Sequence, residues 1–269
     1  MTLKIYQVDA FAEKIFAGNP AAVIPLGNWL DEKLMQNIAM ENNLSETAFF
    51  VKNSSTNGSD QEGSYHLRWF TPEYEIDLCG HATLASAYII KKFIEPHLQE
   101  INFTTEKAGV LKAFSNNGVY TLDFPARMPQ VCEVPENLLP SLGISSAIEI
   151  LKARDYFVVL PNEEAVKNVE PNFELMKNLD AIGVIVTAKG HSADLVSRCF
   201  YPSAGIPEDS VTGSAHCNIV PYWSEKLSIN KFVCRQLSPR GGTLDCELKK
   251  DRVFMSGKCI LYLEGEIYI

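Results

Sequence analysis

An internal repeat constrains the fold of this chain more than any other feature. Residues 68–72 read RWFTP and are followed by 77–82, DLCGHA, while residues 198–202 read RCFYP and are followed by 209–215, DSVTGSA. Both copies have the form R-x-F-x-P, a loop, an aspartate, and a glycine flanked by small and polar residues. The two arginines are 198 − 68 = 130 residues apart in a chain of 269. Repetition at about half the chain length predicts two halves of similar fold.

A buried helix is expected after each glycine. Residues 82–90 (ATLASAYII) are apolar on nearly every side, and the counterpart runs from Ala215 to Trp223. A helix without a polar face must be surrounded by protein. Pro221 lies inside the second segment and is expected to kink or shorten that helix.

The rest of the chain is mostly typical of strands, because β-branched and aromatic runs are bounded by Gly, Pro and Asn. The expected strands are residues 3–9, 21–26, 48–52, 65–70, 101–105, 110–114, 119–124, 156–160, 182–187, 194–200, 232–237, 253–256 and 260–269. Residues 31–42 predict a helix capped by Asp31, with Leu34, Met35 and Ile38 facing the core. Residues 53–64 are expected to form a polar, mobile loop.

These patterns predict an α+β chain of two similar domains, each a curved sheet around a central helix. Prolines at 125, 129, 135 and 140 mark a break near the middle of the chain, where it is expected to cross between the domains.

Charge and motifs exclude several classes of function. The balance of 24 basic and 33 acidic residues gives a net charge of −9, which argues against nucleic-acid or anionic-membrane partners. The sequence contains neither a dinucleotide-binding nor a phosphate-binding glycine loop. Seven cysteines without a C-x-x-C pair favour free thiols in the cytoplasm. The histidines lack zinc-site spacing, and His216-Cys217 has no second pair, so no metal is expected.

The two glycines, Gly80 and Gly213, lie where a loop becomes a helix. The first helical turn has unpaired N–H groups and the positive end of the helix dipole. Two such turns predict binding of a carboxylate or a developing enolate without a lysine. The alternative is that the glycines serve close packing and that Asp77 and Asp209 are ordinary polar residues near a helix.

The chain resembles the PhzF (phenazine-biosynthesis-like) family, a branch of the diaminopimelate-epimerase-like fold. The matching segments are residues 18–23 (GNPAAV), 43–47 (NLSET), 77–83 (DLCGHAT) and 208–216 (EDSVTGSAH). The resemblance implies two barrel-like lobes with the active site between them, and often a homodimer. The implied lobes are residues 1–115 with 258–269, and residues 116–257.

The resemblance also implies roles for individual residues. Glu46 corresponds to the general acid/base, and His81 and Asp209 to its catalytic partners. The implied substrate-binding residues are Ser45, Gly80, Gly213 and Ser214. The implied reaction moves a proton between carbons of a small anionic substrate, a cyclic dihydro-hydroxyanthranilate, and needs no cofactor and no metal.

The chemistry of these residues agrees with the implied roles. A glutamate can exchange protons with carbon if burial in a cleft brings its pKa near working pH, although Glu46 without the motif reads as an exposed loop carboxylate. His81 begins a helix, where the dipole and burial favour a neutral imidazole. The first copy has Cys79 where the second has Thr212, so racemisation by two thiols is not expected. Cys79 is expected to be a small buried filler.

Two other functions remain open at this point. One is a protein of the same fold that binds a small anion without catalysis. The other is a racemase or lyase that acts on a different carbon acid.

Overall fold

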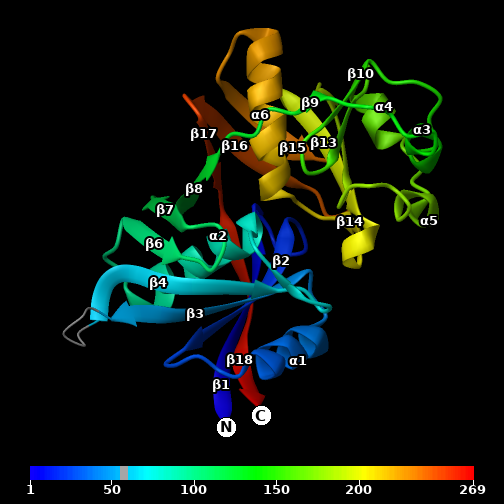
Figure 1. The fold of residues 1–269 in the computed structure, drawn as a ribbon. Coiled ribbons are helices and arrows are strands. Elements are labelled where there is room, and N and C mark those ends of the chain that lie inside the picture. Colours follow the sequence, from blue (N-terminus) through cyan, green and yellow to red (C-terminus); the bar gives the residue numbers. More distant parts are fainter. Residues whose placement is uncertain (55–59) are drawn as a thin grey trace. The chain divides into compact units, whose positions relative to one another are not determined.

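The computed structural model describes residues 1–54 and 60–269. The chain forms two compact units, residues 1–124 with 255–269 and residues 125–254 (Figure 1). The expected boundary at 115/116 differs from this division, because it would cut strand β7 (Val110–Asn116). The expected boundary at 257/258 lies three residues after the observed one, since 257 − 254 = 3. Pro125 is the first residue of the second unit.

The first unit wraps a sheet around one helix, α2 (Gly80–Ile89), which is followed by the π-helical turn η1 (Ile90–Ile94). Helix α1 (Glu32–Asn42) lies between β2 and β3 in the sequence. The strands of this unit are β1 (Thr2–Ala10), β2 (Asn19–Leu26), β3 (Glu46–Ser54), β4 (Asp60–Phe70), β5 (Glu75–Ile76), β6 (Glu100–Thr104), β7, β8 (Val119–Pro125) and β18 (Cys259–Tyr268). Strands β1 and β18 pair antiparallel and carry the two ends of the chain (Figure 1).

The second unit has helix α6 (Gly213–Leu227) in the equivalent place. Its strands are β9 (Gln130–Val131), β10 (Glu149–Lys152), β11 (Tyr156–Val159), β12 (Val184–Lys189), β13 (Leu195–Tyr201), β14 (Ile206–Asp209), β15 (Lys231–Gln236), β16 (Gly242–Lys249) and the start of β17 (Arg252–Gly257). Its short helices are α3 (Leu138–Ser141), α4 (Glu163–Lys167), α5 (Phe173–Met176) and the 3₁₀ turn η2 (Pro202–Ala204).

Strand pairing confirms the repeat. In the first unit β1–β2 is antiparallel, β2–β3 parallel, β3–β4 antiparallel, β4–β6 parallel and β6–β7 antiparallel. In the second unit β10–β11, β11–β12, β12–β13, β13–β15 and β15–β16 follow the same alternation. The short strands β5 and β14 each pair antiparallel with the strand that precedes them. The prediction of two similar α+β domains is therefore correct.

Both central helices are enclosed, as their composition predicts. Every residue of α2 except Tyr88 is buried, and α2 packs against β1, β2, β3, β7 and β18. In α6, residues 215–224 are all buried. Among the described helices, none is long and apolar enough to cross a membrane.

Helix α6 continues through Pro221 to Leu227, so of the two expected effects of this proline, a kink or a shorter helix, the shortening is wrong. Proline has no N–H and leaves the carbonyl four residues earlier without its helical partner. That carbonyl belongs to Cys217, and it accepts a hydrogen bond from the Arg127 backbone N–H at 2.8 Å. The side chain of Asn218 in turn donates to the Arg127 carbonyl at 2.7 Å. The segment after Pro125 thus supplies the hydrogen bond that α6 loses at Pro221.

The predictions for the first helix and the first loop have different outcomes. Asp31 caps α1 as expected, accepting from the Lys33 N–H at 3.0 Å, and Met35 and Ile38 are buried. The polar loop is shorter than expected, because β3 runs to Ser54 and β4 begins at Asp60. The mobility predicted for residues 55–59 lies outside the described residues.

The repeated R-x-F pattern is a clamp on the short strand that leads to each central helix. Arg68 donates through Nε and Nη2 to the Glu75 carboxylate at 2.6 Å each, and its guanidinium lies 5.2 Å from the centre of the Phe70 ring. Arg198 donates to Glu208 at 2.7 and 3.0 Å and lies 5.0 Å from the Phe200 ring. Residues i and i+2 of a strand share one face, so the arginine can stack on that ring while it holds the carboxylate.

The same register corrects the alignment of the two copies. Trp69 pairs with Ile76 in the first unit, and Cys199, one residue after the second arginine, pairs with Asp209. The sequence pattern aligned Asp209 with Asp77. The strand register shows that Asp209 corresponds to Ile76 instead. The two aspartates are therefore not equivalent. The connection after R-x-F-x-P is longer in the second unit, and the sequence alignment of the two copies is one residue out of register at the aspartate.

The clamp gives a prediction about stability. Arg68→Ala should lower the free energy of unfolding by about 2 kcal/mol, because a bidentate charged pair and a ring contact are lost together. Arg68→Lys should recover only part of this, since lysine cannot donate in a fork. Urea denaturation of both variants tests this, with Lys112→Ala as the control. Lys112 pairs with Glu100 at 2.8 Å, but both side chains are more than two-fifths exposed, so its loss should cost below about 1 kcal/mol. Equal losses for Arg68→Ala and Lys112→Ala would contradict the clamp.

Candidate active site

Glu46 is the first residue of β3 and is 7% exposed. It follows the turn that links α1 to β3, and the parallel pairing of β3 with β2 sets it opposite Ala21. The turn residue Ser45 is partly buried. Glu46 is therefore a buried carboxylate and not an exposed loop residue.

His81, the second residue of α2, lies against this carboxylate. Its Nε2 atom is 3.1 Å from Glu46 Oε2, and the residue is 3% exposed. The two atoms are close but not aligned, and within the described part of the chain neither Glu46 Oε2 nor His81 Nε2 has a directed hydrogen bond. The sequence placed these residues in separate motifs, and the structure brings them together with their polar atoms still able to bind a third group.

The other ring nitrogen of His81 is held by neighbours in the same unit. Asn19 Nδ2 lies 3.1 Å and Cys79 Sγ 3.5 Å from His81 Nδ1. An amide can face a neutral ring with its NH₂ group or a protonated ring with its oxygen, so Asn19 can hold either state. Asn19 lies within the GNPAAV segment, but the sequence analysis gave it no role. Its only signal was its place at the start of a buried strand.

The protonation of His81 differs from the expectation. Burial lowers its pKa, but Cys79 and the Glu46 carboxylate together raise it, so the pKa lies well above the ordinary value. Burial and the Glu46 carboxylate in turn raise the pKa of the Cys79 thiol to about 11. Cys79 is therefore uncharged at neutral pH. At that pH the Glu46 carboxylate is the group that raises the pKa of His81. The expected neutral imidazole is wrong because that argument omitted the carboxylate beside the ring.

Both central helices begin as the glycines predicted, at Gly80 and Gly213. The N-cap residues are Cys79 and Thr212, and neither side chain makes a capping hydrogen bond. The free N–H groups of a first helical turn attract an anion. Ser214, in the first turn of α6, is partly buried.

Asp209 belongs to a hydrogen-bonded group of the second unit. It is 7% exposed, and one carboxylate oxygen accepts from Thr212 Oγ1 at 2.6 Å. Gln236 accepts from the Thr212 backbone N–H at 2.8 Å and donates to the Asp209 carbonyl at 2.7 Å. Gln236, which no sequence motif singled out, is buried on the same face of β15 as Phe232 and Cys234, and exposed residues alternate with these three. A polar residue on the buried face of a strand was the available signal.

The two groups of predicted residues lie in different units. Glu46, His81, Gly80 and Ser45 belong to the first, while Asp209, Gly213 and Ser214 belong to the second. Ligand atoms of Glu46, Cys79 and His81 lie within 4.8 Å of one another, so these residues could also hold a cation. The expected absence of a metal stays a prediction.

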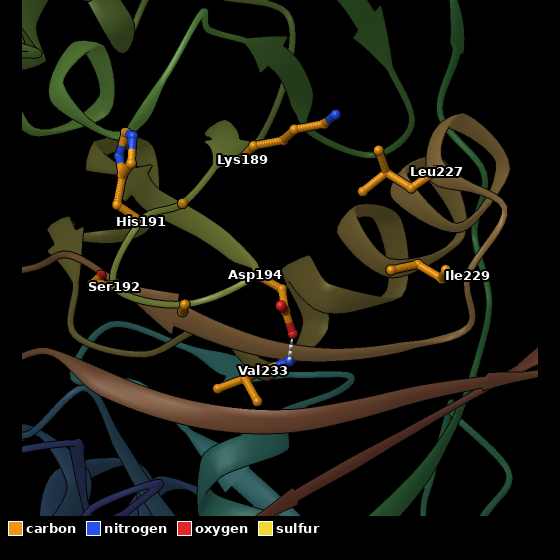
Figure 2. A pocket seen from close by; sticks show the side chains of 9 residues that line it. Lys189, His191, Ser192, Asp194, Leu227, Ile229 and Val233 are labelled. Carbon is orange, nitrogen blue, oxygen red and sulfur yellow. Dashed lines mark hydrogen bonds between the residues drawn. The ribbon is translucent and has the colours of Figure 1, made fainter.

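A surface cavity of about 570 Å³ lies elsewhere in the second unit. Figure 2 shows its lining, which includes Lys189, His191 and Asp194 but none of the predicted site residues. The Asp194 carboxylate accepts a hydrogen bond from the Val233 backbone N–H at 2.7 Å. The candidate active site is therefore taken from the predicted residues, none of which lines this cavity.

Comparison with known proteins now decides the family. The family model described as "Phenazine biosynthesis-like protein" (PhzC-PhzF) matches residues 8–265. This chain belongs to the PhzF family. An uncharacterised isomerase of Pseudomonas aeruginosa is 44% identical over 269 residues and covers 100% of both chains. The crystal structure of a PhzF-family protein from Enterococcus faecalis is 47% identical, with a TM-score of 0.92 over 100% of both chains.

More distant structures define the fold of the PhzF family. A hydroxyproline epimerase from Agrobacterium vitis is 10% identical, with a TM-score of 0.62 over 99% of this chain and 92% of that chain. At this identity the likeness shows the fold alone, which is the epimerase-like α+β fold that the sequence predicted. The relatives named isomerase place this PhzF-family chain among the isomerases.

The contact between His81 and Glu46 gives a prediction about protonation. In Glu46→Gln the pKa of His81 should fall, because burial then acts without an opposing carboxylate. Nitrogen-15 NMR of the imidazole ring across pH measures this. In the wild type, the stabilisation from this contact should be complete below pH of about 6.5 and lost as pH rises through the raised pKa.

The matched control is Glu95→Gln. Glu95 is also a buried carboxylate of the first unit, but it bonds to Lys52 and Tyr65. This variant should leave the His81 titration unchanged. An unchanged pKa in Glu46→Gln would show that the carboxylate does not set it.

Proposed function

We propose that this protein is a cofactor-independent isomerase that moves a proton between carbons of a small carboxylate, with Glu46 as general acid/base. The observation that carries the proposal is the buried pair of Glu46 and His81, 3.1 Å apart and not aligned with each other. A carboxylate excluded from water and beside a donor is what proton abstraction from carbon requires. The family resemblance supports a substrate of the dihydro-hydroxyanthranilate type.

The proposed reaction uses one carboxylate twice. Glu46 removes a proton from one carbon, and the electron pair of that C–H bond enters the conjugated system of the substrate. The protonated imidazole of His81 donates a hydrogen bond to the oxygen on which negative charge develops. Glu46 then returns the proton to a different carbon, and both side chains regain their starting state.

The second unit supplies the proposed substrate-binding groups. The resemblance assigns this role to Asp209, Gly213 and Ser214, and we retain it as part of the proposal. The uncapped first turn of α6 supports it, because its N–H groups suit a carboxylate. Thr212 holds the Asp209 carboxylate at 2.6 Å and so fixes its direction. Gly80 and Ser45 complete the proposed binding residues on the first unit.

Two features argue against the two-thiol chemistry of a racemase. The thiol of Cys79 has its pKa raised to about 11 by burial, and Thr212 occupies the N-cap of the other central helix. A threonine hydroxyl is too weak an acid to replace a thiolate. Proton transfer by a single carboxylate agrees with both observations.

The setting of the enzyme is also a proposal. We propose a cytoplasmic homodimer that acts on a small anion and binds neither nucleic acid nor membrane. The net charge of −9 and the free cysteines support this setting, and the family resemblance supports the dimer. Light scattering coupled to size exclusion would measure the assembly directly.

Solvent-hydrogen exchange tests the proposed function. In D₂O the wild type should incorporate deuterium into cyclic, unsaturated amino or hydroxy carboxylates of the proposed class. Glu46→Gln should lower turnover and exchange by about 100-fold or more, with the fold and ligand binding retained. Circular dichroism and calorimetric titration provide the controls.

The other outcomes separate the alternatives. Equal exchange by wild type and Glu46→Gln would overturn the role of Glu46. Binding of the carboxylates without exchange in either protein would favour an anion-binding protein. Exchange at the α-carbon with inversion would favour a racemase.

A second variant tests the thiol. Cys79→Ser should keep at least about one-third of the wild-type activity, because a buried, protonated thiol beside His81 supports the ring without taking a proton from carbon. Steady-state kinetics on the substrate found above measures this. Complete loss of activity in a folded Cys79→Ser protein would instead support thiol chemistry.

A further inference from the structure

A second cluster of reactive side chains lies in the second unit and has no part in the proposed reaction. Ligand atoms of His216, Cys234 and Cys246 lie within 4.8 Å of one another. The three residues are 0%, 1% and 3% exposed. They come from α6, β15 and β16, so the fold and not the local sequence brings them together.

Strand register explains why both thiols face the helix. In the antiparallel pair β15–β16, Cys234 lies opposite Leu244, and Cys246 lies opposite Phe232. These residues occupy the buried face of the two strands, while their neighbours in sequence are exposed or only partly buried. Helix α6 packs against β16 and brings His216 to the same face.

His216 is oriented in the way that a metal-binding histidine requires. Its Nδ1 atom lies 2.8 Å from the Thr212 carbonyl and donates to it, which leaves the lone pair on Nε2. Within the described residues no oxygen or nitrogen atom is aligned with Nε2 as a hydrogen-bond partner, and the nearby polarisable groups are the thiols of Cys234 and Cys246. Histidine ligands of metals almost always donate their second nitrogen to a carbonyl or carboxylate in this manner.

Packing alone does not account for this arrangement. A buried imidazole nitrogen without a partner is unfavourable, and a thiol is only a weak donor. An apolar side chain in place of His216 would fill the same space without burying a polar nitrogen atom. The donor set of two sulfur atoms and one nitrogen matches the preferences of soft cations.

We propose that His216, Cys234 and Cys246 bind one soft d¹⁰ cation, either Cu⁺ or Zn²⁺. Structural zinc sites take four protein ligands, whereas this group offers three within the described residues. Cu⁺ accepts three ligands readily, so Cu⁺ should bind more tightly than Zn²⁺. The site is separate from Glu46 and His81, and it does not depend on the proposed isomerase activity.

No sequence motif indicates this site. His216-Cys217 has no second pair at zinc-site spacing, because the other two ligands lie on later strands. Cys234 pairs with Leu244, which lies two residues before Cys246. The two thiols therefore come together only when β15 and β16 pair.

The experiment titrates the full chain, reduced and free of oxygen, with Cu⁺ or with Zn²⁺ against a chromophoric competing chelator. The wild type should bind one ion per chain. Cys234→Ser and Cys246→Ser should each weaken binding by about 100-fold or more, and His216→Gln by about 10-fold or more. Cys199→Ser is the matched control, since Cys199 is also a buried thiol of the second unit but lies outside the cluster.

X-ray absorption of the wild-type complex tests the ligands without any variant. Two sulfur atoms and one nitrogen around the ion would support the site. Binding of neither ion, equal affinity in Cys234→Ser and Cys199→Ser, or a shell of oxygen and nitrogen alone would overturn it. Tighter binding of Zn²⁺ than of Cu⁺ would overturn the three-coordinate assignment. Circular dichroism of each variant separates loss of a ligand from loss of the fold.

Discussion

The structure depends on enclosing two helices that have no polar face. Such a helix is stable only when protein surrounds it, so each unit bends its sheet around one helix. The first turn is then the place where backbone N–H groups lack helical partners and polar side chains must gather. In the first unit His81 lies in that turn and Glu46 lies beside it, both under 10% exposed. The candidate site thus lies where the buried helix begins, because the polar groups of that first turn need polar neighbours.

The two units share a scaffold but not a chemistry. Both use an arginine that holds a glutamate and stacks on a phenylalanine, and both follow the same order of strand pairing. Thr47 pairs with Phe70, and Val184 pairs with Phe200, so the position of Glu46 corresponds to Gly183. A Cβ atom at Gly183 would collide with the neighbouring tyrosine ring, which leaves no room for a glutamate. At this position the first unit therefore carries Glu46 beside His81, and the second unit carries a glycine.

Sequence reasoning reached the elements whose pattern is local. The repeat, the two enclosed helices and the apolar strands were predictable because each shows its period within a few residues. Strands β10, β14 and β16 were missed, since charged residues and a proline interrupt their apolar pattern. The burial of Glu46 depends on the parallel pairing of β3 with β2, and the pKa of His81 depends on that carboxylate, 81 − 46 = 35 residues away. The resemblance named these residues, but only the fold supplied the contact between them.

Thr212 occupies the N-cap position in the second unit that Cys79 occupies in the first. Its hydroxyl donates to the Asp209 carboxylate, its N–H donates to Gln236, and its carbonyl accepts from His216. Every polar group of this residue is therefore engaged, and Gln236 contacts both its N–H and its hydroxyl. The second unit thus has, in place of the Cys79 thiol, a hydroxyl that donates to Asp209, while the backbone carbonyl of the same residue accepts from His216.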